Sequence, residues 1–382
     1  MDSNNFDVII IGAGPAGSTC ALALQNTNLR VLLIDKSTFP RDKICGDAVA
    51  AYVPKVLNTI NPELKEKFLN FSKKFPVDTI RIVGSKNRNM DLAFNEVGCI
   101  TKRVELDNFL LEETKKLDNV TVQTGCKVNS IEKTKEGFLV KTQLGDYHSK
   151  MIVGCDGAQG LSRKSLSPIP KDSAHYAGAV RAYYKGVKGI PTSTFEIHFL
   201  KDLIPGYFWI FPLPNGESNI GLGMKTSAIA DGKVNLKQEM INLIENYPGI
   251  KERFEGAEPI SEIQGYGLPL GSRKVPLSGE GFMFCGDAGC LIEPLTGEGI
   301  GQAMISGRYA GWQIKECFEK NDFSAQTMLQ YDKVVYDKLW LEHKRRLQVR
   351  KMIEKFPGMI DFCIGLLEKF PFLNKALKKA FW

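Results

Sequence analysis

The chain has 382 residues, of which 43% are hydrophobic and 24% charged, and its formal net charge is +7. This length suffices for two domains or one elaborated domain with a large core, and the composition is that of a globular protein and excludes a disordered or fibrous one. The nine cysteines form no C-x-x-C pair and the four histidines are scattered, so we expect reduced thiols, no metal site and a cytoplasmic location.

A strand, a glycine-rich turn and a helix open the chain. Residues 8–11 are apolar and β-branched, which predicts a strand buried on both faces. The next six residues, GAGPAG, fit G-x-G-x-x-G: Gly12 permits a tight turn, Gly14 lets a pyrophosphate approach the backbone, and Gly17 lets helix and strand pack closely. Asp35 ends the second strand, where a carboxylate can accept hydrogen bonds from a ribose. We therefore predict a dinucleotide site.

A charged loop containing Pro40 follows and ends at Cys45-Gly46-Asp47, before a helix expected over residues 52–71. A loop thiol beside a cofactor could contact substrate or donate a proton, whereas a lone cysteine more often packs inertly. Both interpretations of Cys45 stay open from the sequence.

Strands are expected within residues 78–94, and a helix from about residue 101 to 116. Arg103 lies just before that helix, where its guanidinium could reach a phosphate or a ribityl oxygen. The alternative is a surface salt bridge with Glu105 or Asp107.

Short strands at 120–123 and 128–131, with a hairpin over 138–153, return the chain to the first sheet. The last strand runs into Cys155-Asp156-Gly157, again a strand end with a carboxylate. Residues 177–184, 195–199, 207–212 and 218–224 alternate like a second, antiparallel sheet. There Tyr207, Trp209 and Phe211 would share one face, either as plain core or as the wall of an apolar pocket.

A helix at 234–252 and a strand or loop at 263–270 lead to a third strand end, after residues 281–284. It carries Cys285-Gly286-Asp287, followed by Gly297-Glu298-Gly299-Ile300-Gly301 and a small-residue helix over 302–315. One long ligand touched at several points explains three such strand ends better than three small ligands do.

Basic residues outnumber acidic ones over residues 331–382 and alternate there with aromatic and aliphatic residues, up to Phe381 and Trp382. This pattern favours a membrane-surface or lid element over a nucleic-acid arm. A solvated basic face on C-terminal helices that cover the core is the alternative.

The three motifs, GAGPAG, Cys155-Asp156-Gly157 with Ser162 and Arg163, and Cys285-Gly286-Asp287-Ala288, resemble in order and spacing the FAD fingerprints of flavoproteins with the p-hydroxybenzoate hydroxylase fold. Within that superfamily the chain is similar to the geranylgeranyl reductase family, on the segment FPRDKICGD (39–47) and on Tyr207-x-Trp209-x-Phe211-Pro212. Flavin-dependent halogenases carry W-x-W-x-I-P, and the replacements at Tyr207 and Phe211 count against halogenation.

The resemblance implies an α/β fold: a Rossmann-like FAD-binding domain (1–75, 100–165, 275–325), an inserted, mostly antiparallel substrate domain (76–99, 166–274) and a C-terminal helical segment (326–382). It also implies FAD contacts by Gly12, Gly14, Pro15, Ala16, Gly17, Asp35, Lys36, Cys45, Gly46, Arg103, Asp156, Gly157, Gly286, Asp287, Gly297, Gly299, Ile300 and Gly301.

The expected activity is reduction of carbon–carbon double bonds in an isoprenoid or similarly long apolar substrate. Tyr207, Trp209 and Phe211 would shape the site, with Cys45 and Tyr207 as candidate proton donors. No second G-x-G-x-x-G exists, so electrons would come from NAD(P)H bound transiently or from a protein donor. The alternatives are a monooxygenase that hydroxylates an aromatic or polyketide, and a non-catalytic, FAD-stabilised lipid-binding protein.

Overall fold

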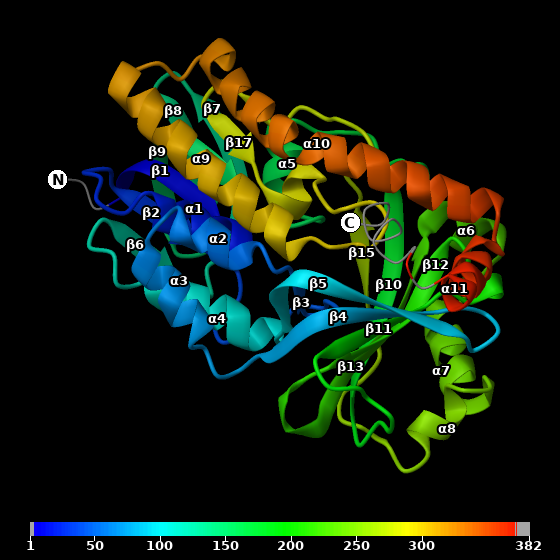
Figure 1. The fold of residues 1–382 in the computed structure, drawn as a ribbon. Coiled ribbons are helices and arrows are strands. Elements are labelled where there is room, and N and C mark those ends of the chain that lie inside the picture. The colour runs from blue at the N-terminus through cyan, green and yellow to red at the C-terminus, as the bar shows by residue number, and fades with distance from the viewer. Residues whose placement is uncertain (1–3, 371, 373–382) are drawn as a thin grey trace.

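The computed structural model describes residues 4–370 and 372, and two β-sheets with flanking helices make up these residues (Figure 1). The first sheet has the order β16-β17-β9-β1-β2-β6, with parallel pairing from β17 through β6. Its strands are β1 (Asn5–Ile11), β2 (Val31–Ile34), β6 (Val120–Gln123), β7 (Val128–Thr134), β8 (Gly137–Thr142), β9 (Gly145–Gly154), β16 (Ser278–Gly279) and β17 (Phe282–Phe284).

Strand β1 is apolar without interruption because both of its faces are covered. Val8 and Ile10 pack into the cluster formed with α1 and α9, whereas Ile9 and Ile11 pack into the cluster formed with β7, β8 and α5. All four residues of β2 are buried for the same reason. This is the pattern of a central parallel strand, and it confirms the predicted Rossmann-like sheet.

The helices of the first half and the long helices of the last third cover this sheet. They are α1 (Pro15–Ala23), α2 (Val53–Asn58), α3 (Pro62–Leu69), α4 (Arg103–Thr114), α5 (Leu161–Leu166), α9 (Ile300–Lys320) and α10 (Ala325–Lys355). Helix α11 (Met359–Lys369) packs instead against the second sheet. Helices α1 and α9 pack so closely that two positions on α9 require glycine. A Cβ at Gly307 would lie 2.2 Å from the carbonyl oxygen of Ala16, and a Cβ at Gly311 would lie 2.6 Å from Cβ of Ala23.

Two helices predicted as continuous are broken. The helix expected over 52–71 is α2 and α3, because Asn61 caps α3 by accepting from the Glu63 N–H at 2.9 Å and Pro62 begins the new helix. The helix expected over 234–252 is α7 (Leu236–Asn246) and α8 (Lys251–Phe254), separated at Gly249, which has φ +84°.

The second sheet has the order β14-β10-β13-β12-β11-β4-β5-β3, with β15 paired to β10. It is antiparallel except where β11 runs parallel to β4. Its strands are β3 (Ala48–Val49), β4 (Phe75–Val83), β5 (Asn89–Ile100), β10 (Tyr176–Lys185), β11 (Thr194–His198), β12 (Gly206–Pro212), β13 (Glu217–Lys225), β14 (Glu258–Pro259) and β15 (Gln264–Pro269). The mostly antiparallel sheet is as predicted, while the domain boundaries stay a prediction.

Period-2 alternation separates the two faces of β12. Trp209 and Phe211 belong to the cluster that faces α10 and α11, whereas Phe208 and Ile210 belong to the cluster under α7 and α8. The remaining elements are α6 (Thr226–Asp231) and the short 3-10 turns η1 (Ser173–His175), η2 (Lys201–Leu203), η3 (Pro214–Gly216) and η4 (Gly286–Gly289).

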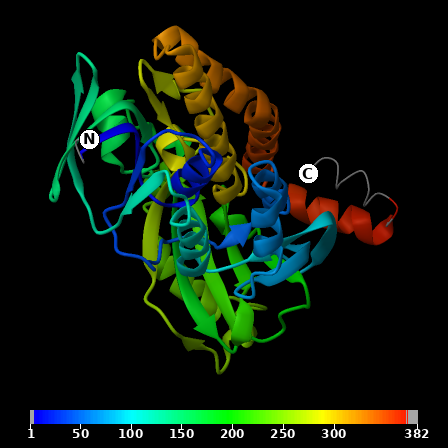
Figure 2. The same cartoon turned by 90° about the vertical axis from the view of Figure 1, so that its left-hand side faces the viewer.

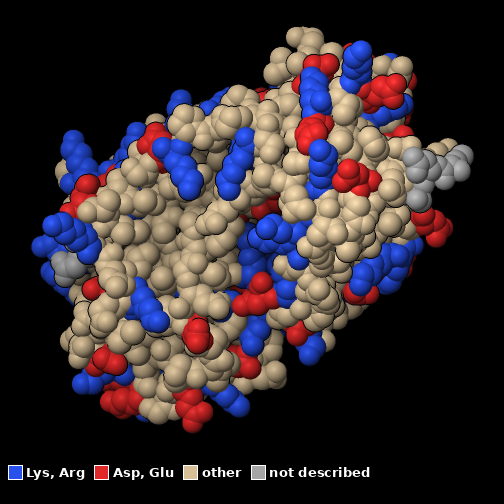
Figure 3. Space-filling view, turned by 180° about the vertical axis from the view of Figure 1, so that it is seen from behind, with Lys and Arg blue, Asp and Glu red and all other residues tan. Residues whose placement is uncertain are grey.

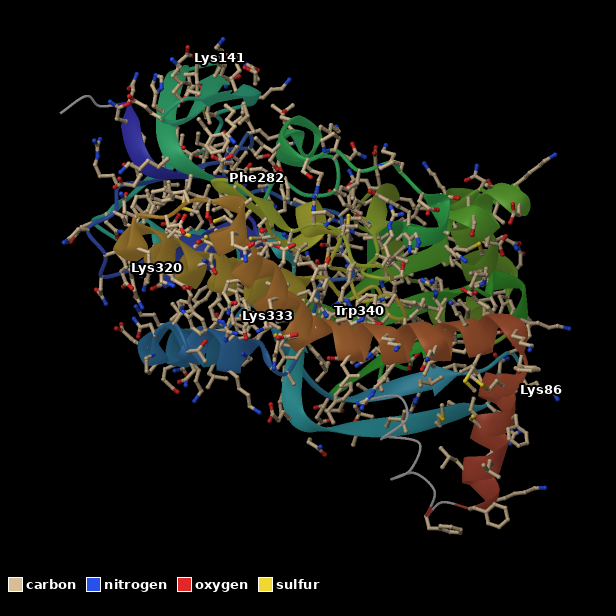
Figure 4. All side chains as sticks on the ribbon, turned by 90° about the horizontal axis from the view of Figure 1, so that it is seen from above. Lys86, Lys141, Phe282, Lys320, Lys333 and Trp340 are labelled. Carbon is tan, nitrogen blue, oxygen red and sulfur yellow. The ribbon has the colours of Figure 1, made fainter. Side chains whose placement is uncertain are left out.

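Helix α10 runs along both sheets (Figure 1), with Tyr331 buried in the core of the first sheet and Ile353 in that of the second. Helix α11 lies at the end of the second sheet near Lys86, in the β4–β5 turn (Figure 4), and on the opposite side from the N-terminus (Figure 2). Leu373, Phe381 and Trp382 of the predicted surface segment lie outside the described residues. Among helices of residues 4–370, none combines the length and apolar character that a membrane span requires.

The contact between α1 and α9 predicts a stability effect. Gly307→Ala places a methyl group 2.2 Å from the Ala16 carbonyl oxygen, and we expect a loss of about 1–3 kcal/mol of unfolding free energy. Gly358→Ala is the control, since a Cβ there has no neighbour within 4 Å. Chemical denaturation compares the two, and equal stabilities would contradict the packing described.

Candidate functional site

The three predicted strand ends lie side by side on one edge of the first sheet. Ile11 of β1 pairs with Gly154 of β9, and Gly154 pairs with Phe284 of β17. The turns that follow are in close contact, because a side chain at Gly12 (φ +105°) would lie 2.3 Å from the carbonyl oxygen of Cys155. Their shared edge is where α/β sheets of this topology bind ligands.

Two guanidinium groups lie over the glycine-rich turn. The side chains of Arg41 and Arg103 reach within 3.6 and 3.7 Å of the position that a Cβ of Gly14 would occupy. Gly14 also begins α1, with no side-chain cap and no acidic residue in the first turn. Bare N–H groups, positive charge and an open approach to the backbone fit a pyrophosphate.

Arg103 is the first residue of α4 rather than the residue before it, and it pairs with Asp107 in the interior, not in the surface salt bridge that the sequence left as an alternative. The pair is buried and bidentate, with N···O distances of 2.7 and 2.6 Å, and Arg41 adds a third contact to Asp107 at 2.7 Å. Burial alone would raise the pKa of Asp107, but the charges of Arg103 and Arg41 hold it below its usual value. The carboxylate therefore fixes both guanidinium groups beside the turn.

The other predicted acidic residues have different surroundings. Asp35 accepts hydrogen bonds from the backbone N–H of Ala13 and of Ser37, both at 2.8 Å, and so lies against the glycine-rich turn, with Lys36 exposed beside it. Asp156 accepts a hydrogen bond from the backbone N–H of Ser162, in the first turn of α5, at 2.9 Å.

Asp287 lies in η4, the turn that follows β17, and pairs with Lys43 at 3.0 Å. Lys43 comes from the FPRDKICGD segment, so this contact links that segment to the third strand end.

A cavity of about 470 Å³, lined mainly by apolar side chains, joins this edge to the second sheet. The predicted site residues that line it are Pro15, Cys45, Gly46, Arg103, Tyr207, Trp209, Phe211, Asp287, Gly297, Gly299 and Ile300. Those outside its lining are Gly12, Gly14, Ala16, Gly17, Asp35, Lys36, Asp156, Gly157, Gly286 and Gly301. Figure 3 shows a hollow on the face opposite to that of Figure 1, with charged side chains of both signs around it.

A buried hydrogen-bond network, which the sequence did not predict, ties the Cys45 loop to the aromatic strand. The amide of Asn219 accepts from the Trp209 indole N–H at 2.9 Å and donates to the Cys45 carbonyl oxygen at 2.7 Å and to the Asp47 carboxylate at 2.8 Å. The Tyr183 hydroxyl also donates to Asp47, at 2.8 Å. Burial raises the pKa of Asp47 to about 6, against the lowering effect of the Asn219 and Tyr183 hydrogen bonds.

The two predicted proton donors both line the cavity. The Tyr207 hydroxyl donates to the carbonyl oxygen of Thr296, and burial raises its pKa well above the usual value. Burial likewise raises the pKa of the Cys45 thiol. Both groups therefore keep their protons at neutral pH.

Comparison with known proteins identifies a matching family model and similar relatives. Residues 5–182 match a family model described as an FAD binding domain. The digeranylgeranylglycerophospholipid reductase of Thermoplasma volcanium is 28% identical over 359 residues, which cover 89% of this chain and 85% of the relative.

Two solved structures share the fold. A geranylgeranyl bacteriochlorophyll reductase-like protein from Thermoplasma acidophilum aligns with a TM-score of 0.80 and 25% identity over 99% of both chains. Halogenase PltM in complex with phloroglucinol and FAD aligns with a TM-score of 0.76 and 16% identity over 98% of this chain and 86% of that one, a likeness in fold alone. The predicted fold class and cofactor, FAD, are confirmed.

Asp287 offers a test of the FAD contacts. We expect Asp287→Ala to weaken FAD binding about 10-fold or more, because a charged acceptor contributes roughly 1.5–3 kcal/mol. Flavin absorbance of the purified protein and FAD titration of the apoprotein measure the effect. Glu280→Ala, at an exposed ion pair with Lys133, is the control. Full flavin occupancy in the Asp287 variant would contradict its role.

Proposed function

We propose that this chain, which is an FAD-dependent oxidoreductase of the geranylgeranyl reductase type, saturates carbon–carbon double bonds in a long isoprenoid-like lipid. The observation that carries the proposal is the apolar cavity that opens from the predicted FAD edge along the aromatic face of β12. The name of the Thermoplasma volcanium relative, a digeranylgeranylglycerophospholipid reductase, supports the same substrate class.

In this proposal the FAD-binding residues of the three turns hold the cofactor, with Arg41 and Arg103 at its pyrophosphate and Asp287 at its ribityl chain. Reduced FAD supplies a hydride to one carbon of the double bond. NAD(P)H bound transiently or a protein donor would supply the electrons, since the chain has a single G-x-G-x-x-G.

The wall of the cavity would hold and orient the substrate. Tyr207, Trp209 and Phe211 stand in a row, with neighbouring ring centroids 5.9 Å apart. Gly46 lies against this row, because a Cβ there would be 3.3 Å from the Phe211 ring. An alkyl chain that lies along these rings would be shielded from water and held beside the proposed cofactor edge.

We also propose that the C-terminal helices rest on a membrane surface from which the lipid is drawn. Phe356, Phe362 and Phe370 expose 56%, 68% and 44% of their surface, and Lys351, Lys355 and Lys369 are exposed beside them. Exposed aromatic and basic side chains together fit an anionic lipid surface. Helix α11 packs into the apolar cluster that contains Trp209 and Phe211, so this surface lies next to the cavity wall.

Anaerobic turnover tests the proposed reaction. Flavin in the reduced protein should be reoxidised by a geranylgeranyl lipid, and mass spectrometry should show a gain of two hydrogens for each reduced bond. Reoxidation by oxygen alone with an oxygenated aromatic product would instead establish a monooxygenase. Tight lipid binding with no turnover would establish a non-catalytic lipid-binding protein.

Trp209→Ala should lower kcat/KM for a long-chain substrate about 10-fold or more, because a buried side chain contributes roughly 1.5–3 kcal/mol of apolar contact. Trp312→Ala, at a residue 39% exposed on α9, is the matched control. Steady-state kinetics compare the two variants. Equal losses in both, or none in either, would argue against a substrate at the aromatic wall.

The double variant F356A/F362A should sediment less with vesicles containing phosphatidylglycerol, because both phenyl groups would enter the lipid interface. Leu144→Ala is the control, since Leu144 is 57% exposed in the turn between β8 and β9. Vesicle binding that survives the double variant would place any membrane contact elsewhere.

A further inference from the structure

Glu298 is a carboxylic acid in the cavity wall, in the glycine-rich segment just before α9. Its side chain lines the cavity with Tyr52, Gly297 and Gly299. It accepts a hydrogen bond from the Tyr52 hydroxyl at Oε1, at 2.8 Å, and one from the Gln302 amide at Oε2, at 3.4 Å. Neither Glu298 nor Tyr52 has a function in the site as described above.

Gly301 and Gln302 accommodate the hydrogen bond between Tyr52 and Glu298. A Cβ at Gly301 would lie 2.2 Å from the Tyr52 hydroxyl oxygen, so only glycine lets that hydroxyl cross the first turn of α9 to reach Glu298. Gln302 is 3% exposed, and its side-chain amide oxygen, Oε1, has no hydrogen-bond partner within the described residues. By turning its amide over, Gln302 can donate to a carboxylate or accept from a carboxylic acid. Both protonation states of Glu298 therefore have a partner.

The charges around Glu298 come from three elements. Tyr52 immediately precedes α2, Glu293 lies in the loop before the glycines, and Arg346 comes from α10. Glu342, also on α10, acts on Tyr52. Burial raises the pKa of Glu298 to about 7, and the Glu293 charge adds to this, against the effects of Tyr52, Arg346 and Gln302. A large fraction of Glu298 is thus protonated at neutral pH, as a general acid requires.

We propose that Glu298 is the proton donor of the reduction, with its proton held at Oε2. The π bond of the substrate breaks, one carbon receives the hydride that reduced FAD supplies, and the π electrons bind the Glu298 proton at the neighbouring carbon. The products are the saturated bond, oxidised FAD and the Glu298 carboxylate, which takes a proton from water before the next turnover. Tyr52 steadies that carboxylate by donating to Oε1.

Glu298 is better suited to this step than the two donors expected from the sequence. Burial raises the pKa of both the Cys45 thiol and the Tyr207 hydroxyl above ordinary values that already exceed neutrality, so each releases its proton less readily. The Tyr207 proton is also engaged with the Thr296 carbonyl oxygen.

The first test needs no turnover. A carboxyl group whose pKa is raised in the folded state binds a proton that the unfolded chain has already released, so its contribution to stability is lost as pH rises from about 4.5 to 7. Between pH 5 and 8, the Tm of the FAD-bound wild-type protein should therefore fall more than that of Glu298→Gln. Glu316→Gln, at an exposed ion pair on α9, should follow the wild type. An unchanged slope in Glu298→Gln would overturn the assignment.

The second test uses single turnover of the reduced protein with a geranylgeranyl lipid. The wild-type rate should fall above about pH 7, whereas Glu298→Gln should be about 100-fold slower or more and lose this dependence. Tyr52→Phe should move the fall to higher pH, because loss of the Tyr52 hydrogen bond raises the pKa of Glu298 further. Cys45→Ala and Tyr207→Phe should retain the fall in rate above about pH 7, whatever their absolute rates, because neither group supplies the proton.

A wild-type rate and profile in Glu298→Gln, or loss of the profile in Cys45→Ala or Tyr207→Phe, would overturn the role of Glu298. This role rests on the proposed function, but the two can fail separately. A wild-type protein that reduces no lipid contradicts the proposed function, while the Tm measurement still decides whether Glu298 holds the proton.

Discussion

The contact between backbone and backbone at Gly12 is the constraint on which the site depends. Gly12 brings the turn after β1 against Cys155, and Gly17 brings α1 against Gly12, at distances that no side chain permits. Hydrogen bonds from the Cys155 N–H to Ile11 and from the Cys285 N–H to Gly154 then hold the second and third turns in line. Residues more than 270 positions apart in the chain thereby share one sheet edge. The proposed cofactor site therefore depends on the register of these strands.

A second set of contacts joins this edge to the proposed substrate-binding face of the second sheet. Asn219 of β13 holds the Cys45 carbonyl, the Asp47 carboxylate and the Trp209 indole at once. Asp47 has φ +66° and also accepts from the backbone N–H of Arg103, the residue whose guanidinium lies over Gly14. Trp209 and Arg103 are thus linked through Asn219 and Asp47 in one buried network. We expect a substitution at either end to alter the position of the other.

Most of the fold and the convergence of the three motifs could be predicted from the sequence, because each depends on local features: uninterrupted apolar strands, glycines at turns and period-2 alternation. Long-range partners could not be predicted in this way. The glycines around Glu298 mark a ligand site but say nothing of a role for the carboxyl group, and nothing adjacent to Asn219 signals a role for its amide. The contacts that define these roles are distant: Asn219 reaches Cys45, 174 positions away, and Glu298 reaches Tyr52, 246 positions away. The helix breaks at Asn61 and Gly249 did have local signals in the sequence, Asn61-Pro62 and Pro248-Gly249. The apolar pattern on either side nevertheless led to the prediction of continuous helices.

Helix α10 sets how the molecule can admit a long substrate. One unbroken helix of 31 residues is anchored at its start in the core of the first sheet, through Tyr331, and near its end in that of the second, through Ile353. Arg350 in addition donates to the Pro294 carbonyl oxygen, beside the cavity. Moving the two sheets apart would bend α10 or remove one of its ends from the hydrophobic core in which it is buried. We therefore expect a long substrate to enter by movement of side chains and short loops at the rim of the cavity, with little change in the distance between the proposed cofactor edge and the aromatic side chains of β12.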